Sequence, residues 1–339
     1  MQKIFLLRKS CNTTVTSHNF NIMKEAAKRC GAEVLDNATL SLCKKQGTKD
    51  DVYIATTVDD VPVLYLIGRK KIFYWVQGIL PEESNMRHKS WLRYIILCLQ
   101  EYIALKMCYC PAFVSEAMKE HYMKKYKISF KRYYIFPCFN TDIVKDAFFS
   151  ENKYKNNYFV YAGGLAVWQC FEKTLSVYKN FEELNLQNTK LIVLTGDQST
   201  AETMIKEKGI QNYEIGFVKK EDLPSKLSCA KFGFVLREDT AVNRVSTPTK
   251  ISTYLSCGLI PIFGSCINSF GSIAQDMTYV VSWGDDPASE NRVSYFMSQP
   301  INPQSVFEEY HFVFDKYYNT ENHTAQIAVI LSKMLNEKD

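Results

Sequence analysis

The sequence lacks any apolar run long enough to cross a lipid bilayer. Its most apolar helical stretch, residues 94–99, lies between Arg93 and Gln100, whereas a transmembrane helix needs about 20 apolar residues. The apolar opening at residues 3–7 is too short for a signal-peptide core, and two basic residues follow it at once. We therefore expect no membrane-spanning helix, and we interpret the opening as a β-strand.

The sequence also lacks the spacings of a redox or zinc site. Eleven cysteines are spread along the chain, and the closest pair, Cys108 and Cys110, is separated by one residue, which fits neither a redox motif nor half of a zinc site. Reduced thiols in a cytoplasmic protein are expected. There are only five histidines, so metal ligation by histidine is not expected, and no metal is predicted to be required. No Ser/His/Asp or Cys/His set indicates a protein nucleophile.

The size and composition indicate two globular domains. A chain of 339 residues with 46% hydrophobic content can bury two cores, which excludes a disordered or fibrous protein. Its charge is asymmetric: residues 1–150 carry 23 Lys/Arg against 14 Asp/Glu, and the rest carries 18 against 22. The basic first half either contacts an anionic membrane or substrate, or forms a solvated lysine-rich face. The charge alone slightly favours the solvated face. The acidic second half argues against nucleic-acid binding.

Short β-branched or aromatic runs alternate with helical patterns along the whole chain, which predicts an α/β protein with parallel sheets. The predicted strands are residues 3–7, 52–56, 72–76, 112–114, 133–136, 158–162, 191–194, 232–236, 259–263 and 279–281. Helices are predicted at residues 20–30, 91–107 and 115–126. The polar segment 150–157 has the composition of a linker and places a domain boundary between about residues 140 and 157. Ligands of such sheets bind beyond the carboxyl ends of the strands, so a ligand is expected where the two crevices face each other.

The residues around position 250 predict a phosphate-binding helix end. Thr247 is a good N-cap, Pro248 suits the first helical position, and Gly258 suits the left-handed residue that ends a helix. Thr249 and Lys250 then lie where free backbone N–H groups and the helix dipole favour an anion. A well-capped surface helix has the same pattern, and for this motif alone it is the favoured interpretation.

Three further segments strengthen the phosphate interpretation. The strand 232–236 leads to Arg237, whose planar guanidinium suits a second phosphate oxygen. Strand 158–162 ends in Gly163 and Gly164, which allow close backbone approach to a phosphate, as does any tight turn between a strand and a helix. The turn at residues 213–218 offers backbone groups to a planar base, although an ordinary loop explains it equally well.

The order of these motifs resembles the C-terminal half of the group 1 (family 4) retaining glycosyltransferases. The similar segments are residues 161–165, 192–197, 216–218, 230–237 and 248–261, and they cover about residues 158–285. Segments 73–78, 113–116 and 135–140, and a last helix at 325–336, are similar to the first half and tail of that family more loosely. The resemblance implies the GT-B fold, with two Rossmann-like doubly wound parallel-sheet domains facing across a cleft. It places an N-terminal acceptor-binding domain at residues 1–145, a nucleotide-sugar-binding domain at 146–315, and a returning C-terminal helix at 316–339.

The resemblance also implies site residues. Carried over by position, the residues implied for the diphosphate are Gly163 and Gly164, with Gln169 beside them, and those for the phosphates are Pro248, Thr249 and Lys250. The residues implied for the base are Gly216, Phe217 and Val218, and Thr253 is implied to lie near the ribose. The chain departs from the family at several of these positions. Gly164 and Gln169 stand where two phosphate-binding cations are usual, Thr253 replaces the ribose-binding Glu, and Gln77 replaces the cleft His.

Other residues of the chain can supply part of what these positions lack. Our hypothesis is that Arg237 and Lys250 restore the positive charge. On the adjacent loop, Glu238 and Asp239 are the carboxylates that could reach the ribose. Arg237, Lys250 and Gln77 are thus the predicted catalytic residues.

The implied activity is sugar transfer with retention of configuration, of the hexosyltransferase type. The donor is a nucleotide sugar, with UDP favoured, and the acceptor is a glycan or a lipid-linked glycan of cell-surface polysaccharide or glycoconjugate synthesis. In the family the leaving phosphate helps to deprotonate the acceptor, so no protein nucleophile is needed. The alternatives are a non-catalytic GT-B partner subunit of a glycosyltransferase and a GT-B epimerase or phosphorylase.

The helix predicted at residues 91–107 has two interpretations. Trp91, Arg93 and Tyr94, together with the basic residues 69–71, suit lipid head groups if the acceptor is lipid-linked. The favoured interpretation is a buried helix with a basic end. The chain is accordingly expected in the cytoplasm, with peripheral contact at the inner face of the membrane as the open alternative.

Overall fold

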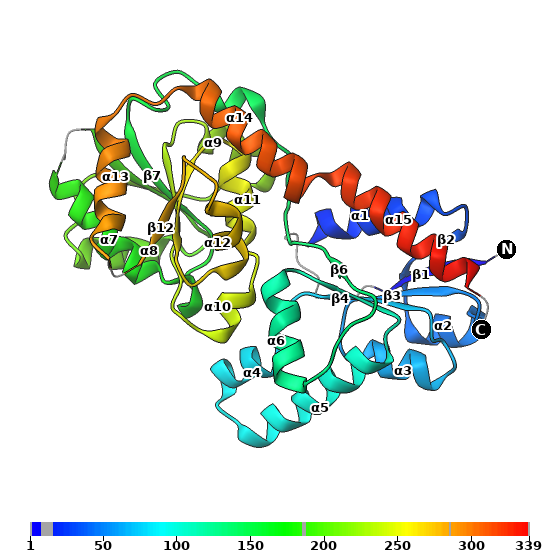
Figure 1. Ribbon diagram of the computed structural model, residues 1–339. Coiled ribbons are helices and arrows are strands. Elements are labelled where there is room, and N and C mark those ends of the chain that lie inside the picture. The colour runs from blue at the N-terminus through cyan, green and yellow to red at the C-terminus, as the bar shows by residue number, and fades with distance from the viewer. Residues whose placement is uncertain (1, 8–15, 185–187, 285, 338–339) are drawn as a thin grey trace. The chain divides into compact units, whose positions relative to one another are not determined.

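The chain divides into two compact units. A computed structural model describes residues 2–7, 16–184, 188–284 and 286–337 (Figure 1). Unit 1 comprises Met1–Asn140, Arg244–Thr247 and Tyr318–Asp339, and unit 2 comprises Thr141–Asn243 and Pro248–Tyr317. Each unit is built around its own parallel six-stranded sheet.

Unit 1 contains a sheet in the order β2-β1-β3-β4-β5-β6, in which every paired strand is parallel. Its strands are β1 (Lys3–Leu7), β2 (Glu33–Ala38), β3 (Val52–Ala55), β4 (Ile72–Val76), β5 (Cys110–Phe113) and β6 (Tyr134–Ile135). Its helices are α1 (Ser17–Arg29), α2 (Leu40–Gln46), α3 (Asp60–Leu66), α4 (Leu80–His88), α5 (Trp91–Met107), α6 (Glu116–Tyr126) and α15 (Thr320–Asn336). The central strands β3 and β4 are buried along their whole length, as expected of apolar strands that are covered on both faces.

The last helix, α15, packs beside α1 in unit 1, and Figure 1 shows the two running together. Arg29 of α1 forms an ion pair with Glu321 of α15, with 2.6 Å between Nη1 and Oε1. At the other end of the helix, the buried Lys71 donates to the carbonyl oxygens of Leu335 and Glu337, at 3.3 and 2.8 Å. The final segment of the chain therefore completes the domain formed by the first.

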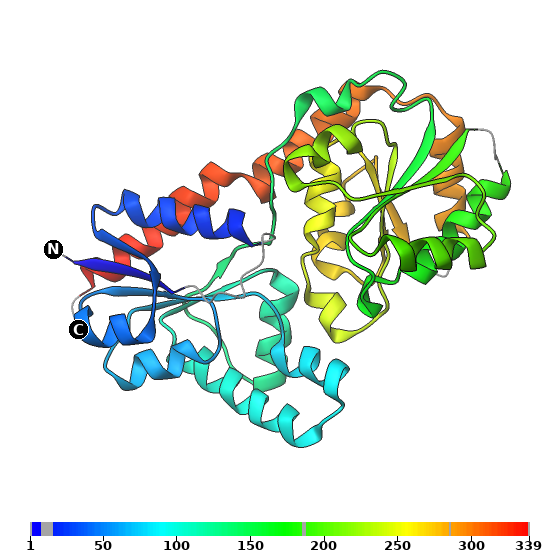
Figure 2. The ribbon, with the colours of Figure 1, turned by 180° about the vertical axis from the view of Figure 1, so that it is seen from behind.

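Unit 2 contains a second sheet, in the order β12-β11-β10-β7-β8-β9 (Figure 2). Its strands are β7 (Asn157–Ala162), β8 (Thr189–Leu194), β9 (Tyr213–Gly216), β10 (Phe232–Val235), β11 (Ile260–Gly264) and β12 (Val281–Trp283). Its α-helices are α7 (Phe171–Leu184), α8 (Gln198–Glu207), α9 (Leu223–Leu227), α11 (Thr249–Ser256), α12 (Asn268–Ala274), α13 (Ala288–Ser298) and α14 (Pro303–Val313), and α10 (Ala241–Val245) spans the boundary between the units. The single-turn or irregular segments are η1 (Lys145–Phe148), η2 (Val167–Gln169), η3 (Lys220–Asp222) and η4 (Phe314–Tyr318).

The strand order of unit 2 creates a topological switch point between β7 and β10. Counted within the unit, the order is that of the Rossmann fold, in which the chain leaves the middle of the sheet first in one direction and then in the other. A stack of aromatic rings supports this centre, with 4.5 Å between the ring centroids of Phe159 and Phe232. Gly163 follows β7 and Arg237 follows β10 at the carboxyl edge, where such sheets bind ligands.

In unit 1 one strand was not predicted from the sequence, and one prediction is wrong. Strand β2 was not predicted, because Asp36 and Asn37 make it polar and it lies at the sheet edge, where one side needs no apolar partner. Helix α5 is not buried: of its residues only Glu101, Ala104 and Leu105 are. Within the described part of the chain, no helix is long and apolar enough to cross a membrane.

Candidate functional site

Helix α11 begins one residue later than predicted. Pro248 is the N-cap, with φ −62° and an extended ψ of 116°, and the first helical residue is Thr249. Thr247 does not cap the helix, because its hydroxyl oxygen accepts a hydrogen bond from the backbone N–H of Cys138 at 3.0 Å. At the other end Gly258 adopts the predicted left-handed conformation, with φ 73°.

The ammonium group of Lys250 is enclosed at the carboxyl end of β7. Its Nζ lies 4.0 Å from the centroid of the Tyr161 ring, and a Cβ atom placed on Gly163 would lie only 2.8 Å from it. This Nζ is inaccessible to solvent and has no hydrogen-bond partner among the described residues. A buried cation without a hydrogen-bonded anion is costly, so the site is electrostatically incomplete.

The environment lowers the pKa of Lys250 well below its usual value. Burial is the main cause, and the positive charge of Arg237 is the second. Both effects disfavour the charged ammonium. A bound anion would oppose them, because a nearby negative charge favours the charged ammonium.

Arg237 is held by Gln169 beside the same strand ends. Its side chain is only 7% exposed, and its Nη2 donates to the Gln169 side-chain oxygen at 2.8 Å. Its Nη1 donates to the carbonyl oxygens of Leu236 and Gln169, at 2.9 and 3.3 Å. These three bonds leave part of the five-donor guanidinium for a ligand, and burial lowers the Arg237 pKa.

The two glycines after β7 have different surroundings. Gly163 has φ 142°, a conformation that favours glycine, and the Lys250 side chain closes the space where its Cβ would lie. A Cβ on Gly164 would meet no atom within 4 Å. Tyr161 anchors this turn, since its hydroxyl donates to the Gly164 carbonyl oxygen at 2.6 Å. The turn thus leaves open space at Gly164, whereas the Lys250 side chain closes the space at Gly163.

Sequence reasoning missed the role of Tyr254. The hydroxyl oxygen of this α11 residue accepts a hydrogen bond from the Ala162 N–H at 2.9 Å, and its ring occupies the space that a side chain at Gly233 would need. These contacts fix α11, and with it Lys250, against β7 and β10. Gly233, inside strand β10, was the sequence signal for this contact, because a glycine within a strand often marks the close approach of another group.

The predicted base-binding residues lie at the end of β9, two strands away from β7: Gly216 is the last residue of the strand, and Phe217 and Val218 follow it. Ala162 pairs with Leu194, and Leu194 pairs with Gly216, so the three strand ends form one row. Adjacent strands are about 4.8 Å apart, which puts Gly216 about 10 Å from the end of β7. Phe217 is 65% exposed. Val218 follows it and is partly buried.

Three more predicted site residues, Thr253, Glu238 and Gln77, are not grouped with Lys250 and Arg237. Thr253 is buried, and its hydroxyl donates to the Thr249 carbonyl oxygen at 2.8 Å. Glu238 is exposed immediately after Arg237, and its carbonyl oxygen accepts from Asn243 at 2.9 Å. Gln77 is partly buried after β4 and belongs to unit 1. The structure therefore groups Gly163, Gln169, Arg237 and Lys250 as one cluster, which we call the switch-point cluster.

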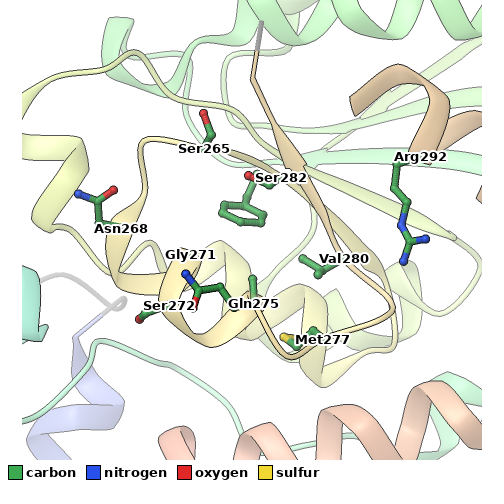
Figure 3. Close-up of a pocket in the computed structure, with 11 residues that line it drawn as sticks. Ser265, Asn268, Gly271, Ser272, Gln275, Met277, Val280, Ser282 and Arg292 are labelled. Carbon is green, nitrogen blue, oxygen red and sulfur yellow. The ribbon is translucent and has the colours of Figure 1, made fainter. Parts of the chain in front are cut away.

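A separate pocket of about 610 Å³ lies along β11, β12 and α12 in unit 2 (Figure 3). Polar side chains line it, among them Ser265, Asn268 and Gln275. Arg292 also lines it, but its Nη2 already donates to the Thr278 carbonyl oxygen at 2.6 Å. None of the predicted donor-binding residues contributes to this pocket. In the described ranges, no group of three or more His, Cys, Asp or Glu side chains is placed to hold a metal ion.

Comparison with solved structures identifies the architecture. No protein-family model and no curated protein sequence matches the chain. It is similar to sucrose-phosphate synthase from Thermosynechococcus elongatus, with a TM-score of 0.70, 12% identity, and coverage of 98% of this chain and 99% of that one. For the E. coli trehalose-6-phosphate structure bound with UDP-2-fluoro glucose, the TM-score is 0.64, the identity is 8%, and the coverages are 99% and 100%. The chain has the GT-B fold.

A third similar structure is a mutant of S. aureus TarM in complex with Fondaparinux, alpha-GlcNAc-glycerol and UDP. The TM-score is 0.61 and the identity 10%, and the match covers 88% of this chain. This chain spans only 59% of the TarM chain. Identities this low establish the GT-B fold alone, and the finer assignment to family 4 remains a prediction.

Proposed function

We propose that the protein is a retaining glycosyltransferase that takes a sugar from a nucleotide-sugar donor, with UDP as the favoured nucleotide. The carrying observation is the enclosed Lys250 ammonium without a hydrogen-bond partner, beside Gly163 at the switch point of a Rossmann sheet. A diphosphate supplies the anion that this position needs. The UDP and UDP-2-fluoro glucose named for two structures of the same fold support this choice.

The proposed chemistry rests on charge stabilisation. As the bond from the sugar to the diphosphate breaks, negative charge grows on the leaving phosphate, and preorganised cations stabilise that change. Lys250 and Arg237 supply the cations, and Gln169 keeps the guanidinium in place. Gly164 lets the backbone approach the diphosphate, and the turn at Gly216 contacts the base.

The proposed acceptor is a glycan or lipid-linked glycan bound by unit 1, in the synthesis of a cell-surface polysaccharide or glycoconjugate. Gln77 is the unit 1 residue proposed to contact the reacting groups. The proposed mechanism uses no metal ion, because the two side-chain cations carry the diphosphate charge.

A non-catalytic partner subunit of a glycosyltransferase is the second candidate. Thr253 stands at the position where the family that this chain resembles has a ribose-binding carboxylate. The observation that favours the second candidate is that the Thr253 hydroxyl already donates a hydrogen bond to the Thr249 carbonyl oxygen. In that case Glu238 does not replace the missing carboxylate, and the chain has lost part of its donor site.

The test is incubation with a panel of UDP-, GDP- and other nucleotide-activated sugars, with and without a crude lipid or glycan acceptor. Release of nucleotide from one donor, increased by acceptor, is the expected result. Nucleotide binding without release under any condition would favour the partner subunit. Absence of both binding and release would contradict the donor site itself.

A further inference from the structure

Helix α5 presents a continuous apolar face to solvent in unit 1. Its exposed apolar side chains recur at the three- and four-residue spacing of a single helix face. They are Trp91, Leu92, Ile95, Ile96, Leu99 and Tyr102. The largest, Trp91, is 74% exposed. A contiguous apolar strip on the outside of a domain marks an interaction surface, unlike single scattered residues.

Two neighbouring helices also carry exposed apolar side chains. Helices α3 and α4 both pack against α5, and both ribbon views show the three along one edge of unit 1 (Figures 1 and 2). Helix α3 contributes the exposed Val63 and Leu66, and α4 contributes Met86. We call the exposed apolar residues of α3, α4 and α5 together the α5 face.

The exposed charges of α5, and of the segment from residue 85 that leads into it, have one sign. Between residues 85 and 106 the basic side chains of Arg87, Lys89, Arg93 and Lys106 are all exposed. The one acidic residue in that range, Glu101, is buried. Cations therefore lie near both ends of the apolar side of α5, with Arg93 in its first turn and Lys106 in its last. This pattern is complementary to an apolar surface that carries negative charge.

Polar contacts on the inner side hold α5 in this orientation. Glu101 accepts a hydrogen bond from Tyr126 at 2.7 Å and forms an ion pair with Lys125 at 3.2 Å. One turn from the start of the helix, the Tyr94 hydroxyl donates to Glu82 at 3.3 Å. Turning the apolar side inward would break these contacts and leave buried charges unpaired, which is strongly unfavourable. The apolar face is therefore a permanent feature of the folded unit.

We propose that the α5 face is a docking surface for a lipid bilayer that contains anionic lipids, with α5 lying in the plane of the interface. The 17 residues of α5 rise about 25 Å, which is shorter than the bilayer core, so the helix lies on the membrane. An apolar face with Trp and Tyr, and exposed basic side chains near both ends of the helix, is the pattern of interfacial helices. A protein interface would more often carry both signs of charge at its rim. The proposal does not depend on sugar transfer.

Flotation with lipid vesicles tests the proposal on the whole chain. Vesicles of phosphatidylcholine with phosphatidylglycerol are expected to bind the protein, and vesicles of phosphatidylcholine alone to bind it much less. Ile96→Asp should weaken binding by more than about tenfold, since it removes apolar contact and adds a negative charge. Arg93→Gln should weaken it about fivefold, since one cation near the surface is lost.

Phe312→Asp is the matched control, because Phe312 is also apolar and exposed but lies on α14 of unit 2. It should bind vesicles like the unchanged protein, and all variants should keep the unchanged melting temperature. Equal binding by Ile96→Asp and the unchanged protein would overturn the proposal. So would failure of the unchanged protein to bind anionic vesicles. A dimer that Ile96→Asp makes monomeric, without vesicle binding, would assign the face to a second copy of the chain.

Discussion

At the scale of single residues, the ionisation of Lys250 makes the donor site testable. Its pKa is lowered mainly by burial and then by Arg237, and a bound diphosphate would raise it again. At a pH above the pKa that Lys250 has in the free protein, UDP binding must therefore take up a proton, and the affinity for UDP must fall as the pH rises. Titration calorimetry between about pH 7 and 10, in buffers of different ionisation enthalpy, measures this uptake.

Lys250→Met serves as the control for that experiment, because it lacks the group that gains the proton. It should bind UDP more weakly and without the pH-dependent uptake. If the unchanged protein shows no uptake at any pH in that range, Lys250 does not contact the bound anion.

The two glycines after β7 provide a second residue-scale prediction. Gly163→Ala should lower the free energy of unfolding by about 1–3 kcal/mol through backbone strain, and it should lower UDP affinity by displacing the Lys250 side chain. Gly164→Ala should change stability by less than about 0.5 kcal/mol, because its Cβ enters open space, yet it should still weaken UDP binding. Denaturant unfolding and calorimetry measure both quantities. Full UDP affinity in Gly164→Ala would show that the diphosphate lies elsewhere.

At the scale of elements, the buried Lys153 caps the end of α9. Its Nζ donates to the carbonyl oxygens of Leu227 and Ser228, each at 3.2 Å. Burial lowers the Lys153 pKa to about 7, partly opposed by Cys257 and Cys229. Because the folded pKa lies below the unfolded value of about 10.4, the folded state binds fewer protons in that window, and stability from this group rises with pH.

Lys153→Met removes that titration. Relative to the unchanged protein, the free energy of unfolding of the variant should be most favourable near pH 6. The difference should decline as the pH rises through the window between the folded and unfolded pKa values and level off above about 10.4, where the native lysine is neutral in both states. Urea unfolding at several pH values measures it. A difference that is constant with pH would mean that Lys153 keeps its charge in the folded protein.

The sequence predicted some elements better than others for physical reasons. Strands β3 and β4 were correctly placed because continuous β-branched and aromatic runs leave little alternative. The start of α11 was misplaced by one residue, because Thr247 and Pro248 both suit the end of a helix and only the tertiary bond from Cys138 decides between them. The burial of α5 was wrong because apolar composition does not say whether a partner covers the helix.

The candidate site was predictable in part. Gly163, Arg237 and Lys250 stand beside strand and helix ends that the sequence marks. Their grouping needs the crossover order of the sheet, in which β7 and β10 become neighbours although about 70 residues separate them. The supporting ring of Tyr161 under the Lys250 ammonium depends on side-chain packing that no spacing encodes.

At the scale of the whole molecule, unit 1 is assembled from three separate parts of the chain. Removal of all residues after Tyr317 should therefore destabilise unit 1 and leave unit 2 folded. The loss should amount to several kcal/mol, since α15 buries Ile327, Leu331 and Met334 at about 2 kcal/mol each. Hydrogen exchange should show the loss of protection in β1 and α1. Loss confined to unit 2 would contradict this assignment of α15.

The most direct test of the account compares two buried lysines of unit 2. Lys250 lies at the carboxyl ends of the strands, whereas Lys231 lies at their amino ends, where its Nζ donates to Asn157 at 3.1 Å. Calorimetry with UDP should show about ten- to hundredfold weaker binding by Lys250→Met, as expected for a lost charged hydrogen bond, and unchanged binding by Lys231→Met. Equal affinity of Lys250→Met and the unchanged protein would contradict the claim that the switch-point cluster binds a nucleotide diphosphate.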